Sequence, residues 1–273
     1  MLMFGITTTL HGLSPLATYG LGALFYLGIA VATFLAPAGM VAAELATGWH
    51  QEGGVYIWVS AAFGRPWGFL ATWLQWLQNL IFWTVILTGS AAMLAIGFGY
   101  PEAAGNRVFV VSVVVGTIWF TTFMTVRGLH STGNLGIVGS LLGTVLPGVV
   151  LIGMAAWYLV RGGTNHLSLD PATLLPDLSQ PGNLSFAISI VMVFSGVELM
   201  GTRACEVRDL NKTYPRASLL AIGLTIALLA PVTLAISVLV PVDDLNIAAG
   251  LVQAVKIVYS AQGIGWMAGF FAV

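Results

Sequence analysis

Long apolar segments separated by short polar ones run through the whole chain. A helix needs about 20 residues to cross the hydrocarbon core of a bilayer, and most of these segments reach that length. The pattern predicts seven spans and the start of another near residue 264, after a loop with a short amphipathic helix. The expected spans are 1–14 (short and rich in Thr), 21–46, 66–98, 108–126, 135–160, 184–204 and 217–240. The predicted fold class is an all-α membrane protein, a multi-span helical bundle.

The composition agrees with a membrane protein and excludes several functions. Charged residues make up 7% of the chain, whereas a soluble domain carries about 25%. The net charge of −1 offers no basic surface for nucleic acid. Cys205 is the single cysteine, so neither an intrachain disulfide nor a Cys-rich metal site is expected. The sequence has no catalytic-triad spacing, phosphate-binding loop or metal-ligand cluster, and it therefore predicts neither an enzyme nor a cofactor.

The basic residues predict an orientation, because cytoplasmic loops of membrane proteins carry more Lys and Arg. If the loop after the second span is cytoplasmic, six basic residues lie on that side: Arg65, Arg127, Arg203, Arg208, Lys212 and Arg216. Three lie outside: Arg107, Arg161 and Lys256. This distribution predicts a multi-pass protein of the cell membrane with a cytoplasmic N-terminus.

Polar side chains inside apolar spans are costly and mark candidate functional positions. In the first span, Thr7, Thr8 and Thr9 indicate one of two arrangements. The helix is broken and its freed backbone groups meet a ligand, or the hydroxyls bond back to their own helix. In the third span, Gln75 and Asn79 are four residues apart and share a helix face. They either join helices together or line a polar path.

The sixth span contains Ser195 and Gly196 beside an acid, Glu198. Glycine lets a helix unwind, so we expect regular helical hydrogen bonding to be lost around Ser195 and Gly196. A carboxylate at this depth must be protonated, or else paired and hydrogen-bonded. Three roles for Glu198 follow: it bonds unwound backbone amides, it takes part in proton traffic, or it is a structural carboxylate paired with Arg203.

Two glycine patterns predict local backbone geometry. Gly53 and Gly54 lie in the polar stretch 48–64 between the second and third spans. They indicate either a tight turn that re-enters the protein or an ordinary loop. Gly136, Gly139 and Gly143 have the spacing that suits close contact between helices.

Three longer segments carry a resemblance to a known family. One is Pro37-x6-Glu44-Leu45 followed by Glu52-Gly53-Gly54-Val55-Tyr56-x-Trp58. The next is Phe63-Gly64-x3-Gly68-Phe69, leading into Trp73-Leu74-Gln75-Trp76. The last is Phe194-Ser195-Gly196-Val197-Glu198, then Glu206 and Tyr214-Pro215-Arg216. In this order and at these places the segments resemble the amino acid–polyamine–organocation (APC) permeases, above all the glutamate/GABA-antiporter-like branch, over nearly the whole chain.

The resemblance implies a twelve-helix fold in which helices one to five and six to ten are inverted repeats. Helices one and six of that fold are broken at the substrate site, where half-helix N-termini take the amino acid carboxylate. A polar residue of helix three often reaches the substrate and is best matched by Asn79; an aromatic gate in helix six is matched by Met192 or Phe194. The substrate-binding residues predicted in this way are Thr7, Thr8, Thr9, Gln75, Asn79, Met192, Val193, Phe194, Ser195 and Gly196, with Glu198 as a proton-carrying or structural carboxylate.

Compared with that family, the chain is expected to be incomplete, with about seven to eight of twelve spans. Residues 1–160 match the first repeat without the start of its first helix. Residues 161–183 match an extracellular loop, and residues 184–273 match part of the second repeat. The stretch Ile6-Thr7-Thr8 lacks the Gly-Ser-Gly break of many members, as the glutamate/GABA branch also does.

The function expected from this resemblance is amino acid transport by a permease or antiporter that is present as a fragment. Two alternatives stay open: a nonfunctional remnant of a permease, and a non-transporting membrane protein or membrane-embedded enzyme. The expected partners are an amino acid substrate and membrane lipid, and the sequence leaves both proton coupling and plain exchange open. A fragment lacking later helices is not expected to exchange amino acids by itself.

Overall fold

The computed structural model describes residues 10, 13–49, 51, 53–127, 136–167, 171–176, 181–194, 196, 198–199, 209–242, 245 and 253–257. These residues form helices, turns and irregular segments, and none of them lies in a strand. Five helices are long and apolar enough to cross a membrane: Gly22–Gly48, Arg65–Gly97, Arg107–Val126, Gly136–Val160 and Asn211–Leu239. The predicted all-α membrane fold is confirmed, as are the second, third, fourth, fifth and seventh spans.

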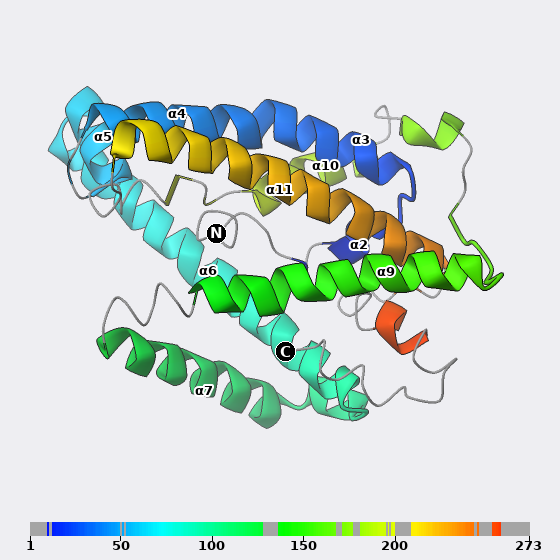
Figure 1. Ribbon diagram of the computed structural model, residues 1–273. Helices are drawn as coiled ribbons and strands as arrows, with labels where there is room; N and C mark the ends of the chain where they lie inside the picture. Colours follow the sequence, from blue (N-terminus) through cyan, green and yellow to red (C-terminus); the bar gives the residue numbers. More distant parts are fainter. Residues whose placement is uncertain are drawn as a thin grey trace.

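The labels of Figure 1 divide some of these spans into shorter helices. In chain order the labelled helices are α2 (Leu13–Ala17), α3 (Gly22–Ala30), α4 (Ala36–Gly48), α5 (Val55–Phe63), α6 (Arg65–Gly97), α7 (Arg107–Val126), α9 (Leu146–Val160), α10 (Pro181–Val193) and α11 (Leu210–Leu239). Helix α10 ends well before residue 204, the predicted end of the sixth span. Helix α2 continues past residue 14, the predicted end of the first span, of which Thr7, Thr8 and Thr9 lie outside the described residues.

Two helices extend into segments that were expected to be loops. Helix α11 begins before residue 217 and includes Pro215. Helix α5 occupies most of the stretch 48–64, so the prediction of a plain loop there is wrong. Gly53 and Gly54, directly before α5, have φ of +128° and +46°, which glycine adopts without a side-chain clash. The paired glycines therefore form a tight turn, and a helix follows it.

Two of the spans contain a π-helical turn close to a proline. One turn, Val31–Leu35, joins α3 to α4, and Pro37 follows it in the first turn of α4. The other, Leu141–Val145, precedes α9, which has Pro147 in its first turn. Proline lacks an N–H group, and its ring displaces the carbonyl four residues before it. A wider turn relieves that clash, so the second and fifth spans remain continuous helices despite their prolines.

Helix α11 is the centre of the largest helix group, which we call the α11 group (α2, α3, α4, α9, α10 and α11). It packs against α2, α3, α4 and α9, and α10 packs against α3 (Figure 1). Leu16, Leu151 and Ile236 are fully buried where these helices meet. Ser237 Oγ donates a 2.8 Å hydrogen bond to the Ala17 carbonyl at the end of α2. The same carbonyl also accepts a 3.1 Å bond from the Gly20 N–H, so the bond from Ser237 joins the end of α2 to α11.

Helix α6 crosses the α11 group obliquely and packs against α5 and α7 (Figure 1). The contact with α5 is close at Gly68, where an added Cβ would collide with the Ser60 side chain and lie 2.8 Å from the Tyr56 carbonyl oxygen. By contrast, Gly139 and Gly143 have no atom within 4 Å of an added Cβ. The predicted helix contact at these two glycines is therefore wrong for the described part of the chain.

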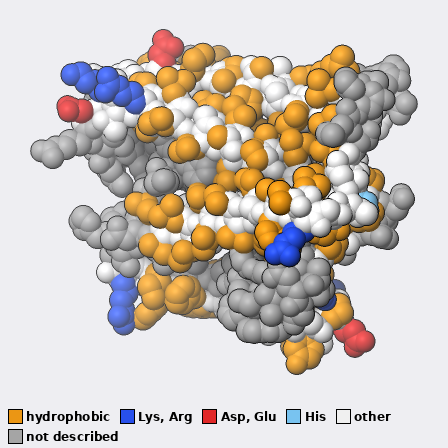
Figure 2. All heavy atoms as spheres, turned by 45° about the vertical axis from the view of Figure 1, so that its right-hand side comes forward, with side chains coloured by type: hydrophobic (Ala, Val, Ile, Leu, Met, Phe, Trp, Pro, Cys, Tyr) orange, Lys and Arg blue, Asp and Glu red, His pale blue; other side chains and the backbone are white. Residues whose placement is uncertain are grey.

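The outer surface of the described helices is largely apolar. Figure 2 shows hydrophobic side chains spread over the described part of one face, with few charged groups among them. Exposed large side chains are frequent on α6 and α7 and include Trp67, Phe69, Trp73, Trp76, Trp83, Val108 and Trp119. Water would make such a surface costly, whereas hydrocarbon accommodates it. The exterior thus agrees with the multi-pass membrane protein that the hydropathy predicts.

Candidate substrate site at the interrupted sixth span

The sixth span loses its helical backbone where the sequence predicts. Helix α10 ends at Val193, and the N–H of Phe194 donates to the Val191 carbonyl over 3.2 Å. Gly196 has φ of +111°, which cannot continue a right-handed helix. After it, the N–H of Leu199 donates to the Gly196 carbonyl over 3.0 Å in a short turn. The interruption is confirmed, although Ser195 lies outside the described residues.

Glu198 is bonded to the backbone that this interruption frees. Its Oε2 accepts a 3.0 Å hydrogen bond from the N–H of Gly196. An amide at a helix break has no carbonyl one turn earlier to pair with, and a carboxylate oxygen is a strong replacement acceptor. Of the three roles that the sequence left open for Glu198, bonding to unwound backbone amides is confirmed. The alternative pairing partner, Arg203, lies outside the described residues.

Helix α6 brings a second group to the same carboxylate. The Gln75 side chain donates from Nε2 to Glu198 Oε1 over 3.4 Å. One turn further, Asn79 Nδ2 donates to the Gln75 backbone carbonyl over 2.9 Å. Both residues are half-buried, and this bond places them on one face of α6, as their spacing predicts. Gln75 therefore links α6 to the interruption, whereas the Asn79 amide is turned back onto its own helix.

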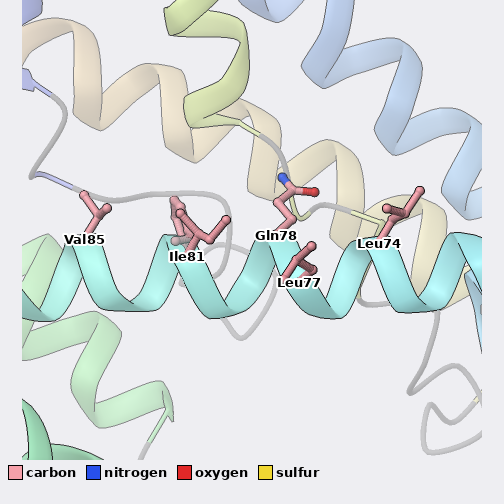
Figure 3. Close-up of a pocket in the computed structure, with 6 residues that line it drawn as sticks. Leu74, Leu77, Gln78, Ile81 and Val85 are labelled. Atoms are coloured by element: carbon pink, nitrogen blue, oxygen red, sulfur yellow. The ribbon is translucent and has the colours of Figure 1, made fainter.

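The same part of α6 lines an open hollow of about 480 Å³. Figure 3 shows side chains that line the hollow projecting from α6, with the carboxamide of Gln78 among apolar groups. The lining residues are Leu74, Leu77, Gln78, Ile81, Phe82 and Val85. Because Leu74 and Gln78 lie on either side of Gln75 along α6, the hollow overlaps the part of α6 that contacts Glu198.

The remaining predicted site residues are only partly described. Met192 and Val193 form the last turn of α10, and nothing is described of their side chains. Phe194 is 1% exposed and belongs to the hydrophobic core, so it does not line the hollow on α6. Among the described residues, no group of three or more His, Cys, Asp or Glu is placed to hold a metal ion.

The family model for amino acid permeases, described as "Amino acid permease", matches residues 1–273. This chain belongs to the amino acid permease family. An uncharacterized transporter of Legionella pneumophila is 34% identical over 94% of the permease chain. A glutamate/gamma-aminobutyrate antiporter of Lactococcus lactis is 26% identical over 97% of it. A third relative, named "Probable agmatine/putrescine antiporter" in Lactococcus lactis, is 25% identical over 95% of it.

The permease chain spans about half the length of these curated relatives. The shares of their lengths that are covered are 55%, 53% and 54%, in the order given. The resemblance to APC permeases is confirmed by the family match. Because the family and these relatives are transporters, the alternative of a membrane-embedded enzyme is set aside.

The structure also shows a buried polar residue of the permease to which sequence reasoning gave no role. Tyr214, in the second turn of α11, is 1% exposed. Its hydroxyl has no hydrogen-bond partner in the described part of the chain. The sequence offered one signal, the Tyr214-Pro215-Arg216 motif, but motif membership does not tell which way a side chain points.

Glu44, the other acid inside a predicted span, lies away from the interruption. It is exposed in the last turns of α4. It lines a groove of about 280 Å³ between α4 and α11 with Gly39, Met40, Ala43, Thr47, Pro215, Ser218 and Leu219. The two acids that the sequence placed in spans therefore have different surroundings, and only Glu198 is bonded to the interrupted backbone.

Proposed function

We propose that the protein carrying this chain is a secondary transporter that moves amino acids or related amines across the cell membrane. The observation that carries the proposal is the interruption at Gly196, whose freed amide is bonded by Glu198 while Gln75 of α6 bonds the same carboxylate. Irregular backbone at membrane depth is tolerated only where it is buried in protein or lines a polar cavity. In a family of transporters, the function that fits such a site is to form part of the path of the substrate.

The proposed substrate contacts lie where α10 ends and α6 passes it. Freed backbone groups from Val193 to Gly196 would bond the polar ends of the substrate, and Asn79 would turn from the Gln75 carbonyl toward it. Met192, Phe194 and Ser195 would complete this side of the site. Gln75 would approach the substrate from α6, and Thr7, Thr8 and Thr9 from the first span.

The proposed substrates follow from the family and its named members. An antiporter for glutamate and gamma-aminobutyrate and one named for agmatine and putrescine both match this chain over most of its length. These compounds share an amine on a short flexible carbon chain. We infer an amino acid or polyamine substrate and exchange of one such compound for another. The second possible mode of transport is proton coupling through Glu198. Uptake into vesicles that contain no substrate for exchange would favour this mode.

The proposed domain division follows the inverted-repeat resemblance. Residues 1–160 would form the first repeat, 161–183 an extracellular loop, and 184–273 part of the second. The helices described on both sides of the loop support this division, since α2 to α9 precede it and α10 and α11 follow.

Asn79→Leu is expected to lower exchange by at least about tenfold, since one lost polar contact to a substrate is worth about 1–3 kcal/mol. The measurement is uptake of labelled glutamate, gamma-aminobutyrate or putrescine by proteoliposomes that are preloaded with the same compound and contain the full protein. Thr84→Val is the matched control, because Thr84 is an exposed residue of α6 whose hydroxyl bonds its own helix at the Leu80 carbonyl. Equal loss in both variants, or none in Asn79→Leu, would remove Asn79 from the site.

The proposed orientation has a cytoplasmic N-terminus. In a Cys205→Ser background, we expect a membrane-impermeant thiol reagent applied to intact cells to label Asp177→Cys. It should not label Lys212→Cys until the cells are opened. The distribution of basic residues is the reason for this expectation. Successive spans cross the membrane in opposite directions, which places four basic residues at helix starts or ends on the same side: Arg65, Arg127, Lys212 and Arg216. The reverse labelling pattern would invert the topology.

A further inference from the structure

The groove between α4 and α11 is an apolar channel with an acid at one end. Its floor consists of the small residues Gly39, Ala43 and Ser218. Ser218 is buried and donates a 3.3 Å hydrogen bond from Oγ to the Gly39 carbonyl, which joins the two helices. Met40 and Leu219, which are 58% and 59% exposed, line the groove farther out. The groove is therefore built into the contact between two packed helices.

Glu44, at the end of this groove, lies close to the membrane boundary. The span Gly22–Gly48 has 27 residues and is about 40 Å long, so it extends roughly 5 Å beyond each side of a hydrocarbon core of about 30 Å. Glu44 is four residues before the end of this span, about 6 Å from it. Trp49, directly after the span, is 40% exposed, and tryptophan is typical of this boundary. The groove thus leads from the headgroup region toward the acyl chains.

The register of α4 and α11 brings basic residues to the same end. The two helices lie side by side and run in opposite directions (Figure 1). Because Ser218 bonds Gly39, the step of about five residues along α4 to Glu44 corresponds to a step of about five residues back along α11. That step reaches the turn of α11 that contains Lys212 and Arg216. These two residues are four apart and therefore share a side of the helix.

These charged groups are available to a ligand. Glu44, Lys212 and Arg216 are all exposed. Within the part of the chain that the structure describes, none of the three side chains forms a hydrogen bond or an ion pair. An unpaired charge beside hydrocarbon is unfavourable, so each of them needs a partner of opposite charge. A molecule that carries both a cation and an anion on an apolar tail would satisfy this end of the groove.

We propose that the groove binds phosphatidylethanolamine. One acyl chain lies between Met40 and Leu219, the ammonium group donates to Glu44, and Lys212 and Arg216 bind the phosphate. This headgroup matches the acid and the two bases at once. Phosphatidylglycerol has no cation for Glu44. The quaternary ammonium of phosphatidylcholine has no N–H group to donate, so neither of these lipids satisfies the whole set.

The size of the groove favours an acyl chain over another helix as its occupant. Its volume is about 280 Å³. A single helical turn, about 10 Å wide and 5.4 Å long, occupies roughly 400 Å³. A helix at this place would fit only a side chain into the groove, and it would also have to bring a cation to Glu44. A phospholipid supplies the chain and the cation in one molecule.

This inference goes beyond the proposed function, and its test measures lipid binding without transport. The full protein is freed of lipid in detergent and titrated with phosphatidylethanolamine, phosphatidylcholine or phosphatidylglycerol, and bound lipid is measured by native mass spectrometry. Phosphatidylethanolamine should bind at least about fivefold more tightly than the other two. This factor is that of one ion pair that remains partly exposed to water.

Glu44→Gln is expected to lower the affinity for phosphatidylethanolamine by about fivefold and to leave that for phosphatidylglycerol unchanged. Glu102→Gln is the matched control, because Glu102 is an exposed acid in the short helix Pro101–Gly105, away from the groove, and should change neither affinity. Met40→Trp keeps the charges but fills the groove, and it should also weaken binding of phosphatidylethanolamine. The same affinity for this lipid in Glu44→Gln and Glu102→Gln, or tighter binding of phosphatidylglycerol by the unmodified protein, would overturn the proposal.

Cross-linking in a bilayer tests whether lipid or protein occupies the groove. Phosphatidylethanolamine with a photoreactive diazirine in one acyl chain is incorporated into nanodiscs with the full protein. Adducts are expected on the groove residues of α4 and α11, and Met40→Trp should reduce them. Their absence from both helices would mean that another part of the protein or a second copy covers the groove, and the lipid site would be rejected.

Discussion

Replacing Gly196 by leucine is expected to abolish transport by the protein that carries this chain. Gly196 has φ of +111°, a conformation that costs a residue with a side chain about 1–3 kcal/mol. Its N–H also bonds Glu198, so a change of backbone there breaks the link between the interruption and its carboxylate. Uptake of labelled substrate into preloaded proteoliposomes should fall to the level of protein-free vesicles.

The control for Gly196→Leu lies in the same span. Gly182 lies in the first turn of α10, and its φ is not positive. Among the described residues, none has an atom within 4 Å of an added Cβ there. Gly182→Leu should therefore retain exchange. Both variants are compared at equal amounts of monodisperse protein. A third variant, Gly196→Ala, introduces the backbone strain of a side chain at positive φ without the volume of leucine. Exchange at the unmodified rate in Gly196→Leu would show that the interruption plays no part in transport.

Replacing Gly68 by valine is expected to cause the largest loss of stability. An added Cβ at this position would collide with Ser60 and lie 2.8 Å from the Tyr56 carbonyl oxygen, so α5 must move away from α6. Overpacking of this kind costs about 1–3 kcal/mol, and a backbone oxygen cannot rotate aside as a side chain can. We expect the Tm of the detergent-purified protein, followed by size-exclusion chromatography after heating, to fall by about 5 °C or more.

Gly116→Val is the matched control for Gly68→Val. Gly116 lies in α7, and no atom of the part of the chain that the structure describes lies within 4 Å of an added Cβ there. Both changes put the same β-branched residue into a helix, so their difference isolates the contact between α5 and α6. If both variants have the same Tm, Gly68 does not set the distance between these helices.

Hydropathy located five of the predicted membrane spans correctly, because the hydrocarbon core leaves a crossing backbone few alternatives to a helix. An apolar segment of about 20 residues must satisfy its own N–H and C=O groups, and a helix does so without any other part of the chain. Five spans follow from this rule. The interruption in the sixth span was predicted for a similarly local reason, since Gly196 permits a backbone that other residues resist.

Helix α5 and the glycines show where local patterns were insufficient. The stretch 48–64 was expected to be either a re-entrant turn or an ordinary loop, yet α5 forms in it and packs on α6 at Gly68. Gly139 and Gly143 have a spacing that suits helix contact, but in the described part of the chain nothing lies within 4 Å of an added Cβ at either. Gly148, which no pattern singled out, is the close contact of that span, with Leu228 Cδ1 2.8 Å from an added Cβ. Spacing shows which residues share a face, but not which face meets a neighbour.

The sequence by itself determined the helical membrane fold, the place of the interruption and the membership of a permease family. Each of these depends on neighbouring residues or on motifs read in order. Only the tertiary structure decided that Gln75 and Glu198, 123 positions apart, bond to each other. Hydropathy does not encode such contacts, because they arise when helices formed independently pack at particular angles and rotations.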